Sequence, residues 1–367
     1  MHPSHFAKST PDKPAFIMAG SGEVVTYLQL EQRSNQIAQF FRSLGLQPDD
    51  HIAIHMENNR YFMEIVWAAQ RSGIIYTAIS THLREEEIAY IVDNCEAKVL
   101  ISSNALGDLA GNIRSRCNGL QDCFMVGGTS HGYLSLEGAI ESQQNTPIND
   151  EERGVQMLYS SGTTGRPKGV LPKRVPGESI QVMTPSAATL GVKFGFSENT
   201  VYLSPAPLYH AAPLTYNTIT MHLGGTSIIM ERFDAERSLE LIEKHKVTHS
   251  QWVPIMFIRM LRLDEKLRAQ FDFSSHKVAI HAAAPCPVEI KHQMIDWWGP
   301  IINEYYGSTE GMGFTALNSK QWLNHPGSVG SPLGCRIKIL DDEGQELPDG
   351  EIGTVYFADR IGDFSYY

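Results

Sequence analysis

The stretch "YSSGTTGRPKGV", residues 159–170, is the most informative part of the chain. It follows a short, mostly apolar run at residues 155–158 that has the pattern of a strand. Every residue from Ser160 to Gly169 is a Ser, Thr, Gly, Pro, Arg or Lys. Glycines let a backbone approach a ligand closely, while hydroxyl groups and cations bind anionic oxygens. The composition therefore predicts an anion-binding loop at the end of a strand.

The charge around this loop is opposite in sign to that of the whole chain. The 367 residues carry a formal net charge of −11, which argues against a nucleic-acid partner. Residues 166–174, in contrast, hold four cations and no acid. A phosphate about 4 Å from one cation gains roughly 4 kcal/mol at an effective dielectric near 20, before desolvation. Distant acids are screened beyond about 8 Å, so the local field favours an anion.

The loop differs from a Walker phosphate loop, which needs GxxxxGK followed by Ser or Thr. Gly162 stands six residues before Lys168, but Pro167 precedes the lysine and Gly169 follows it. Proline has no backbone N–H to donate to a phosphate. A solvated turn is the common alternative for a loop rich in Gly and Ser, and the loop alone leaves both interpretations open.

Helices and strands alternate along most of the chain. Thr26 and Gln29 form a capping-box pattern, apolar residues then recur at helical spacing, and Gly45 ends that helix. Further helices are expected at 60–73, 84–95, 234–246, 254–263 and 288–298, and strands at 51–56, 74–80, 98–102, 201–204, 226–230, 248–253, 277–282 and 301–306. This alternation predicts an α/β fold with largely parallel sheets covered by helices.

The order of these segments predicts a large domain over residues 1–325, built from two facing α/β lobes at roughly 1–195 and 196–325. The polar stretch 140–153 is expected to be a surface connection. From residue 326, period-2 runs are broken by turn sequences. This change predicts a partial β subdomain over 326–367, the start of a β-barrel.

The cysteines and the N-terminus bear on the compartment. The five cysteines show no CxxC spacing, so we expect reduced thiols without a disulfide framework or a zinc site. The first residues lack the apolar core of a signal peptide, and no run of about 18 apolar residues is present. We therefore expect a cytoplasmic protein without a transmembrane segment.

A second motif, "NEYYGSTEG" at 303–311, follows the first loop by about 140 residues. Further matching segments are "TPDKPAFI" (10–17), "PLYHAAP" (207–213), "HAAAPCP" (281–287) and "PGSVGSPLGCRIKILDDEG" (326–344). In this order they resemble the adenylate-forming superfamily of acyl-CoA synthetases, luciferases and peptide-synthetase adenylation domains. The resemblance covers essentially the whole chain and implies the fold of an acyl-CoA synthetase N-terminal domain.

The resemblance also implies a role for each motif residue. The residues that would hold the phosphates of ATP are Ser160, Ser161, Gly162, Thr163, Thr164, Gly165, Arg166 and Lys168. Glu310 and Ser160 would bind magnesium, an ion that prefers oxygen ligands. The residues around adenine would be Tyr306 against its face and Glu304, Tyr305, Ala283 and Ala284 at its edge. The residues implied to be catalytic are Lys168, Thr309 at the α-phosphate, Glu310 and His210.

Outside these motifs, the same residues would have ordinary structural roles. A lone His such as His210 is usually packed or solvated. Glu310 would most often be a surface carboxylate, and Tyr306 would be part of the core.

His210 is implied to line an acyl pocket near the reacting carboxylate. The rest of its wall is expected to come from Trp252, Val253, Met256, Phe257, Ala282 and Gly307. These residues are mostly apolar, so we expect a hydrophobic acid such as a medium- or long-chain fatty acid or a bulky alicyclic acid. A Trp-Met-Phe patch is more often core than pocket, which is the alternative interpretation.

The resemblance implies a two-step reaction. A carboxylate attacks the α-phosphate of ATP and gives an acyl-adenylate and pyrophosphate, and the thiol of CoA then displaces AMP. Two alternatives remain: a fatty acyl-AMP ligase that loads a carrier protein, and a non-catalytic ATP- or acyl-binding module. A homodimer and peripheral contact with a membrane are compatible with the resemblance.

Two features depart from the family pattern. After Val170 the chain continues with "LPKRVPGES" (171–179), and a CoA contact by Lys173 or Arg174 is a hypothesis. Full-length relatives continue through a Thr-Gly-Asp segment into a small C-terminal lid domain whose lysine assists adenylation. Neither is found in this sequence, so we expect a chain without the lid that binds ATP weakly and turns over slowly.

Overall fold

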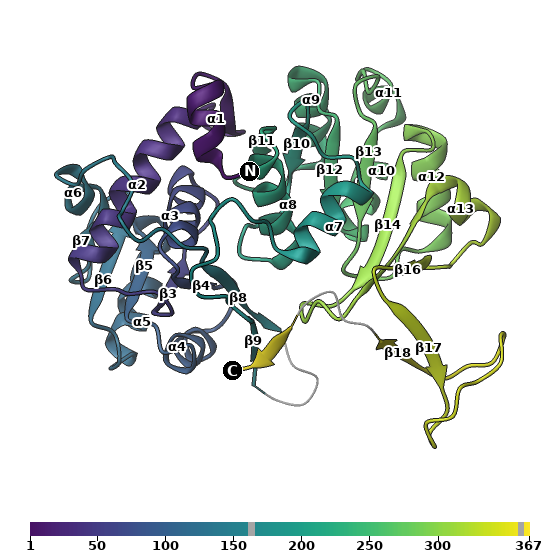
Figure 1. The fold of residues 1–367 in the computed structure, drawn as a ribbon. Coiled ribbons are helices and arrows are strands. Elements are labelled where there is room, and N and C mark those ends of the chain that lie inside the picture. The colour runs from purple at the N-terminus through teal and green to yellow at the C-terminus, as the bar shows by residue number, and fades with distance from the viewer. Residues whose placement is uncertain (161–165, 359–362) are drawn as a thin grey trace.

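A computed structural model describes residues 1–160, 166–358 and 363–367 of the chain (Figure 1). Its strands form two large sheets and one small antiparallel pair. This is the predicted α/β architecture, and the helices cover the faces of both sheets (Figure 1). Within the described residues, no helix has the length and the apolar run that crossing a bilayer would need.

The first sheet has eight strands in the order β19-β9-β8-β4-β3-β5-β6-β7. Their bounds are β3 (His51–His55), β4 (Ile75–Ala78), β5 (Val99–Ser103), β6 (Asp122–Val126), β7 (Leu134–Ser135), β8 (Val155–Ser160), β9 (Lys168–Pro172) and β19 (Phe364–Tyr366). The pairs from β8 to β7 are parallel, whereas β9 pairs antiparallel with both β8 and β19. The helices of this lobe are α2 (Tyr27–Ser43), α3 (Arg60–Arg71), α4 (Glu85–Asn94), η1 (Asn104–Leu106), α5 (Asp108–Arg116) and α6 (Leu136–Glu141).

The second sheet has nine strands in the order β16-β15-β14-β13-β12-β10-β11-β1-β2. Their bounds are β1 (Pro14–Met18), β2 (Val24–Thr26), β10 (Val201–Ser204), β11 (Thr226–Ile229), β12 (His249–Trp252), β13 (Val278–His281), β14 (Ile302–Gly307), β15 (Phe314–Asn318) and β16 (Ser331–Leu333). The helices are α1 (Pro3–Ser9), α7 (Pro185–Lys193), α8 (Ala211–His222), α9 (Ala235–His245), α10 (Pro254–Leu261), α11 (Glu265–Arg268), α12 (Val288–Trp298) and α13 (Ser319–Asn324).

The two sheets do not divide the chain at residue 195, where the sequence predicted the boundary between the lobes. β1 pairs parallel with β11, so residues 14–26 belong to the sheet of the second lobe. The alternating pattern could not indicate this, because pairing with a strand some 200 residues away is settled by tertiary packing. At the other end, β17 (Arg336–Leu340) and β18 (Thr354–Ala358) form the small separate hairpin, which projects from the second lobe (Figure 1).

Local signals in the sequence explain the helix ends. The Thr26 hydroxyl accepts a hydrogen bond from the Gln29 backbone N–H, and the Gln29 side chain accepts one from the Thr26 backbone N–H (3.2 and 2.9 Å). This is the predicted capping box at the start of α2. Gly45 follows the end of α2 with a φ of 81°, which glycine adopts without strain.

The core between the lobes is continuous. One cluster of buried apolar side chains contains residues of α2, α3 and β3 together with residues of α8 and β11. Burial of shared apolar surface of this kind holds two layers together. The two lobes therefore pack against each other through a shared core. The five cysteines are free thiols, as expected.

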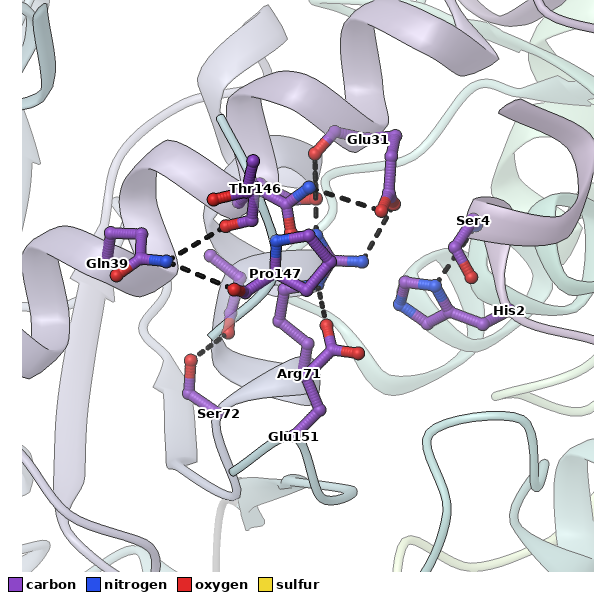
Figure 2. A network of polar contacts seen from close by, with 12 residues as sticks. His2, Ser4, Glu31, Gln39, Arg71, Ser72, Thr146, Pro147 and Glu151 are labelled. Atoms are coloured by element: carbon purple, nitrogen blue, oxygen red, sulfur yellow. Dashed lines mark hydrogen bonds and ion pairs between the residues drawn. The ribbon is translucent and has the colours of Figure 1, made fainter. Parts of the chain in front are cut away.

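A buried arginine, Arg71, anchors the loop that leads to β8. Its side chain is fully buried and pairs with Glu31 of α2 at 2.7 Å and with Glu151 at 3.1 Å (Figure 2). Gln39 of α2 donates hydrogen bonds to the backbone carbonyls of Thr146 and Pro147 in the same connection (2.9 and 3.2 Å; Figure 2). The stretch expected to be a surface connection is thus fastened to α2 and α3 by polar contacts.

Replacing Arg71 tests how much this anchor stabilises the fold. Arg71→Met removes the partner of two carboxylates in a buried site, and we expect a loss of about 3–5 kcal/mol in the free energy of unfolding. Urea denaturation followed by circular dichroism measures this change. The control is Arg237→Met, whose pair with Glu240 is exposed and should contribute no more than about 1 kcal/mol. Equal losses in the two variants would show that the network does not stabilise the fold.

Candidate functional site

The anion-binding loop predicted from the sequence connects two adjacent antiparallel strands. Ser160 at the end of β8 pairs with Lys168 at the start of β9. The hairpin thus brings the Ser160 hydroxyl and the Lys168 ammonium to the same end of the first sheet. The predicted phosphate-binding residues Ser161, Gly162, Thr163, Thr164 and Gly165 lie outside the described residues.

One tyrosine connects the two sequence motifs across the lobes. Tyr366 of β19 donates a hydrogen bond from its hydroxyl to Glu310 Oε1 at 3.1 Å. The Lys168 ammonium lies 5.6 Å from the centre of the same ring, within the range of a cation–π contact. Strand β19 lies beside β9, between the two lobes (Figure 1). The structure therefore brings Lys168 and Glu310 to the same place, although they are far apart in the sequence.

The cations around this place are not equivalent. Arg166 and Lys168 are both exposed, and the Arg166 guanidinium lies 5.0 Å from the centre of the Tyr90 ring. Arg174, in contrast, forms ion pairs with Asp49 and Glu152 at 2.5 and 3.0 Å, and its side chain is only 5% exposed. These pairs hold the pKa of Arg174 above its ordinary value, mainly through the hydrogen bonds that Arg174 donates to Asp49. The Arg174 side chain is thus occupied by ion pairs within the protein. Lys173, in contrast, is exposed and lies beside a surface hollow near Phe364.

The second motif lies on β14, and its side chains alternate between the two faces of that strand. The Glu304 carboxylate is buried, where Lys291 donates a hydrogen bond to it and His281 Nε2 lies 3.5 Å away. Tyr305 points to the other face, where its ring lies 6.2 Å from that of Tyr216. The side chains predicted to edge the adenine therefore face opposite layers of the protein, and both are already packed.

Tyr306 and the residues after it are accessible. The Tyr306 side chain is 46% exposed, with its ring 6.1 Å from that of Phe357. Thr309 is exposed and Glu310 is half-buried. Ala283, at the end of β13, has a φ of 75°, the left-handed conformation that costs a non-glycine residue roughly 1–2 kcal/mol. The exposed backbone of Ala283 and Ala284 thus forms a tight turn beside this part of the site.

His210 lies at the start of α8, in a loop that Asn58 holds in place. The buried Asn58 side chain donates hydrogen bonds to the backbone carbonyls of Ala206 (3.2 Å) and Met230 (2.7 Å). Its carbonyl oxygen accepts a hydrogen bond from the Leu208 backbone N–H at 2.8 Å. One side chain of the first lobe therefore satisfies three backbone groups of the second lobe, and one of them, the Leu208 N–H, lies two residues before His210.

The surroundings of His210 keep its imidazole neutral. His210 is exposed on one side, but the protein packed on its other side and the nearby His82 both lower its pKa from the ordinary value of 6.5, with burial the larger cause. His82 Nδ1 lies 2.7 Å from the Tyr209 hydroxyl, and the Tyr209 ring lies 4.7 Å from the His210 ring. At pH 7 His210 can donate one hydrogen bond to an oxygen without carrying charge.

The expected wall of the acyl pocket is divided between the two faces of the second sheet. Trp252 is fully buried against Trp298 and Phe257, and Met256 and Val253 pack into the same cluster beneath α10 and α12. His210 begins α8, which covers the opposite face. The prediction that Trp252, Val253, Met256 and Phe257 form one wall with His210 is therefore wrong. Their hydrophobicity reflects core packing.

The other two predicted wall residues lie on the face covered by α8. Ala282 continues the side of β13 on which Ile280 packs against the α7 and α8 layer. Gly307 lies so close to Phe314 that a Cβ atom there would come within 2.4 Å of its ring, so only glycine fits. Sequence reasoning missed Gln251, which precedes Trp252 on β12 and faces α8. The period-2 alternation of the strand was the signal that could have identified it.

A magnesium site would have to rely on few protein ligands. Among the residues that the structure describes, no group of three or more His, Cys, Asp and Glu side chains could hold a metal ion. The half-buried Glu310 carboxylate accepts a hydrogen bond from Tyr366 and retains oxygen capacity for a cation. Magnesium commonly binds through one or two carboxylates together with phosphate oxygens, so these residues fit such an ion.

Comparison with known proteins gives a family for the whole chain. The family described as AMP-binding enzyme matches residues 4–361. A fatty acid–[acyl-carrier-protein] ligase, ScoC, from Streptomyces coeruleorubidus is 26% identical over 97% of this chain and 67% of its own length. A 4-hydroxybenzoate–CoA/benzoate–CoA ligase from Rhodopseudomonas palustris is 26% identical over 94% of this chain and 63% of its own length. The chain thus spans about two thirds of the length of these relatives.

Solved structures agree with the fold. The N-terminal domain of FACL13 from Mycobacterium tuberculosis superposes with a TM-score of 0.84 at 22% identity, covering 98% of this chain and 88% of that one. The o-succinylbenzoate CoA synthetase MenE from Bacillus subtilis superposes with a TM-score of 0.77 at 21% identity, covering 96% and 68%. These likenesses confirm the predicted fold of an acyl-CoA synthetase N-terminal domain.

Replacing Asn58 tests whether it positions the loop of His210. Asn58→Ala leaves three buried backbone groups without partners, and we expect a loss of about 2–4 kcal/mol in the free energy of unfolding. The NMR signals of His210 should also shift, because the loop loses its anchor. The control is Asn112→Ala. The Asn112 amide donates an exposed hydrogen bond to Glu85, so this substitution should change the free energy of unfolding by less than about 0.5 kcal/mol. An Asn58→Ala variant with unchanged His210 signals would contradict this role.

Replacing His82 tests the electrostatic part of the His210 pKa shift. His82→Gln removes the neighbouring imidazole whose electrostatic effect lowers the pKa of His210, so the pKa of His210 should rise. It should remain below 6.5, because burial, the larger cause, is unchanged. NMR titration of the imidazole carbon-bound protons between pH 4 and 8 measures both values. His245→Gln, on the distant helix α9, is the control and should leave the titration of His210 unaltered.

Proposed function

We propose that this chain, which belongs to the AMP-binding enzyme family, activates a carboxylic acid by reaction with ATP. The observation that carries the proposal is the junction of Lys168, Tyr366 and Glu310 between the two lobes. In this junction a cation and a carboxylate, one from each motif, contact the same tyrosine side chain. A nucleotide triphosphate that binds magnesium needs both kinds of group.

In the first step, the carboxylate oxygen of the acid attacks the α-phosphorus of ATP, and pyrophosphate leaves. The acid is already ionised at neutral pH, so no general base is needed. Lys168 and Arg166 would neutralise charge on the phosphates, and the Ser160 and Thr309 hydroxyls would orient them. Tyr306 offers an exposed ring face to the adenine.

The residues that would hold magnesium are Glu310 and Ser160. A bound magnesium ion would supply further charge neutralisation at the phosphates. His210, neutral at pH 7, would donate a hydrogen bond to the acid and so orient its carboxylate for attack. The remainder of the acid would extend along α8, on the face that Ile280, Phe314 and Tyr216 line.

In the second step, a thiol attacks the acyl carbon and AMP leaves. We propose CoA as the acceptor, in line with the names of most relatives, of which the benzoate ligase is one example. A carrier-protein thiol is the second candidate, because ScoC is a fatty acid–[acyl-carrier-protein] ligase. Adding CoA or a phosphopantetheinylated carrier protein to a preformed adenylate distinguishes the two acceptors.

Acid-dependent exchange of pyrophosphate into ATP tests the first step directly. We expect the 367-residue chain to catalyse exchange with at least one acid from a panel that runs from acetate through benzoates to palmitate. Lys168→Ala and Glu310→Gln should each lower the exchange rate by about 100-fold or more, because each removes charge stabilisation of the phosphates.

A surface pair provides the matched controls. Lys338→Ala and Glu346→Gln alter an exposed ion pair on the β17–β18 hairpin and should leave exchange within about twofold of the unmodified chain. ATP binding without exchange for every acid would contradict the proposal and favour a binding module. Exchange that survives both Lys168→Ala and Glu310→Gln would contradict the assigned roles.

A further inference from the structure

A buried layer between α8 and the second sheet contains more polar groups than a hydrocarbon pocket needs. Alternation along β10 places Tyr202 and Ser204 on the face toward α8, and alternation along β12 places His249 and Gln251 there. Helix α8 packs against β10, β11 and β12. The strand register, with Leu203 beside Ser250, sets Ser204 next to Gln251.

Two amide side chains in this layer have their orientation set by carbonyl groups. The Asn217 amide nitrogen donates to the Pro213 carbonyl and to Ser204 Oγ, each at 2.8 Å. The Gln251 amide nitrogen donates to the Trp252 carbonyl at 2.8 Å. A carbonyl can only accept, so neither amide can be turned around without losing a bond.

As a result, two acceptor oxygens are left over. Asn217 Oδ1 and Gln251 Oε1 are buried and have no hydrogen-bond partner among the described residues. Asn217 is fully buried and Gln251 is 1% exposed. A buried acceptor without a donor is unfavourable, and proteins satisfy the great majority of such groups. Both oxygens therefore lack a hydrogen-bond donor among the described residues.

The two oxygens lie in the layer between α8 and the second sheet, which is the path of the acid in the proposed function. His210 is the N-cap of α8, and Asn217 follows it by seven residues, which is two turns on the same face. The separation along the helix is about 10 Å. Gln251 lies near the carboxyl end of β12, where ligands bind in open α/β sheets. Tyr216 and Tyr305 pack beside this path.

We infer that the acid carries a hydroxyl or amino group at the end distant from its carboxylate, and that this group donates to Gln251 Oε1. An amino group, which has more than one N–H, can donate to Asn217 Oδ1 as well. This inference rests on the proposed function, since it concerns the far end of the same pocket. A plain alkyl chain would bury both oxygens against hydrocarbon and leave them unpaired. It also revises the sequence-based expectation of a wholly hydrophobic acid.

Non-hydrolysable acyl-sulfamoyl adenosines test the inference without turnover. Two matched pairs differ only in the donor: 4-hydroxybenzoyl with 4-methylbenzoyl, and 8-hydroxyoctanoyl with nonanoyl. Isothermal titration calorimetry on the 367-residue chain gives the four affinities. In at least one pair, the hydroxyl compound should bind about 10- to 100-fold more tightly than its methyl counterpart.

A substitution then assigns the preference to the named acceptor. Gln251→Met keeps the side-chain length but removes the oxygen, so the two affinities of the preferred pair should come within about twofold. Gln293→Met on the exposed face of α12 is the matched control and should retain the full preference. Thermal melts of both variants verify that they fold. If Gln251→Met is unfolded, Gln251→Glu replaces it, and its carboxylate should retain or increase the preference for the hydroxyl compound.

The outcomes separate the two levels of the proposal. Equal affinities within both pairs would overturn the inference and would mean that buried water satisfies the two oxygens. A preference that Gln251→Met leaves intact would overturn the assignment as well. Failure of all four compounds and of ATP to bind would overturn the proposed function itself, and the inference with it.

Discussion

The hydrogen bonds of Asn58 are the interaction on which the arrangement of the site depends. Asn58 follows β3 in the first lobe, and its three partners are backbone groups at the ends of β10 and β11 in the second. Where strand pairing stops inside a buried region, carbonyls and N–H groups need other partners. One amide supplies both a donor and an acceptor, which an apolar residue cannot do. The loop that carries Tyr209 and His210 is consequently placed by a contact between the lobes.

The two faces of the second sheet differ in character. Beneath α10 and α12 the sheet packs Trp252, Phe257 and Trp298 into a dense aromatic cluster. Toward α8 the same strands present Ser204 and Gln251 among tyrosines. A fully apolar face gives rigidity, whereas a face with fixed polar groups can discriminate among ligands. The aromatic cluster beneath α10 and α12 fixes the positions of the strands, and the strands in turn fix the positions of the polar side chains that face α8.

Much of this fold could be predicted from the sequence, because the signals are local. The Thr26 cap, the helical spacing after it and the alternating segments each depend on neighbouring residues, and they agree with the structure. The two motifs also indicated the family. Residues 14–26 were harder to place. β1 pairs with β11, some 200 residues away, and the local sequence of β1 does not indicate which strand it pairs with.

The side-chain layer of β12 was mispredicted for a different physical reason. Trp252 was selected because it is large and apolar, but hydrophobicity does not distinguish a ligand pocket from a core. In a strand, neighbouring side chains point to opposite faces, so the choice between Gln251 and Trp252 depends on which helix covers which face. That information comes from the packing of α8 and α12, elements that lie far from β12 in the sequence. Trp252 therefore belongs to the core beneath α10 and α12, and Gln251 is the residue of this pair that faces α8.

Tyr366 contacts charged residues of both motifs, Lys168 and Glu310. The chain as a whole is acidic, yet the cations Arg166 and Lys168 are exposed where the chain enters β9. In the described residues, their side chains contact the aromatic rings of Tyr90 and Tyr366. An aromatic ring satisfies a cation only weakly, by about 0.5–1 kcal/mol at an exposed site. A phosphate in the same position interacts several times more strongly, even with water nearby. A phosphate is therefore a stronger partner for Lys168 than the Tyr366 ring. Tyr366 thus links a cation of the first motif and the carboxylate of the second motif through a single side chain.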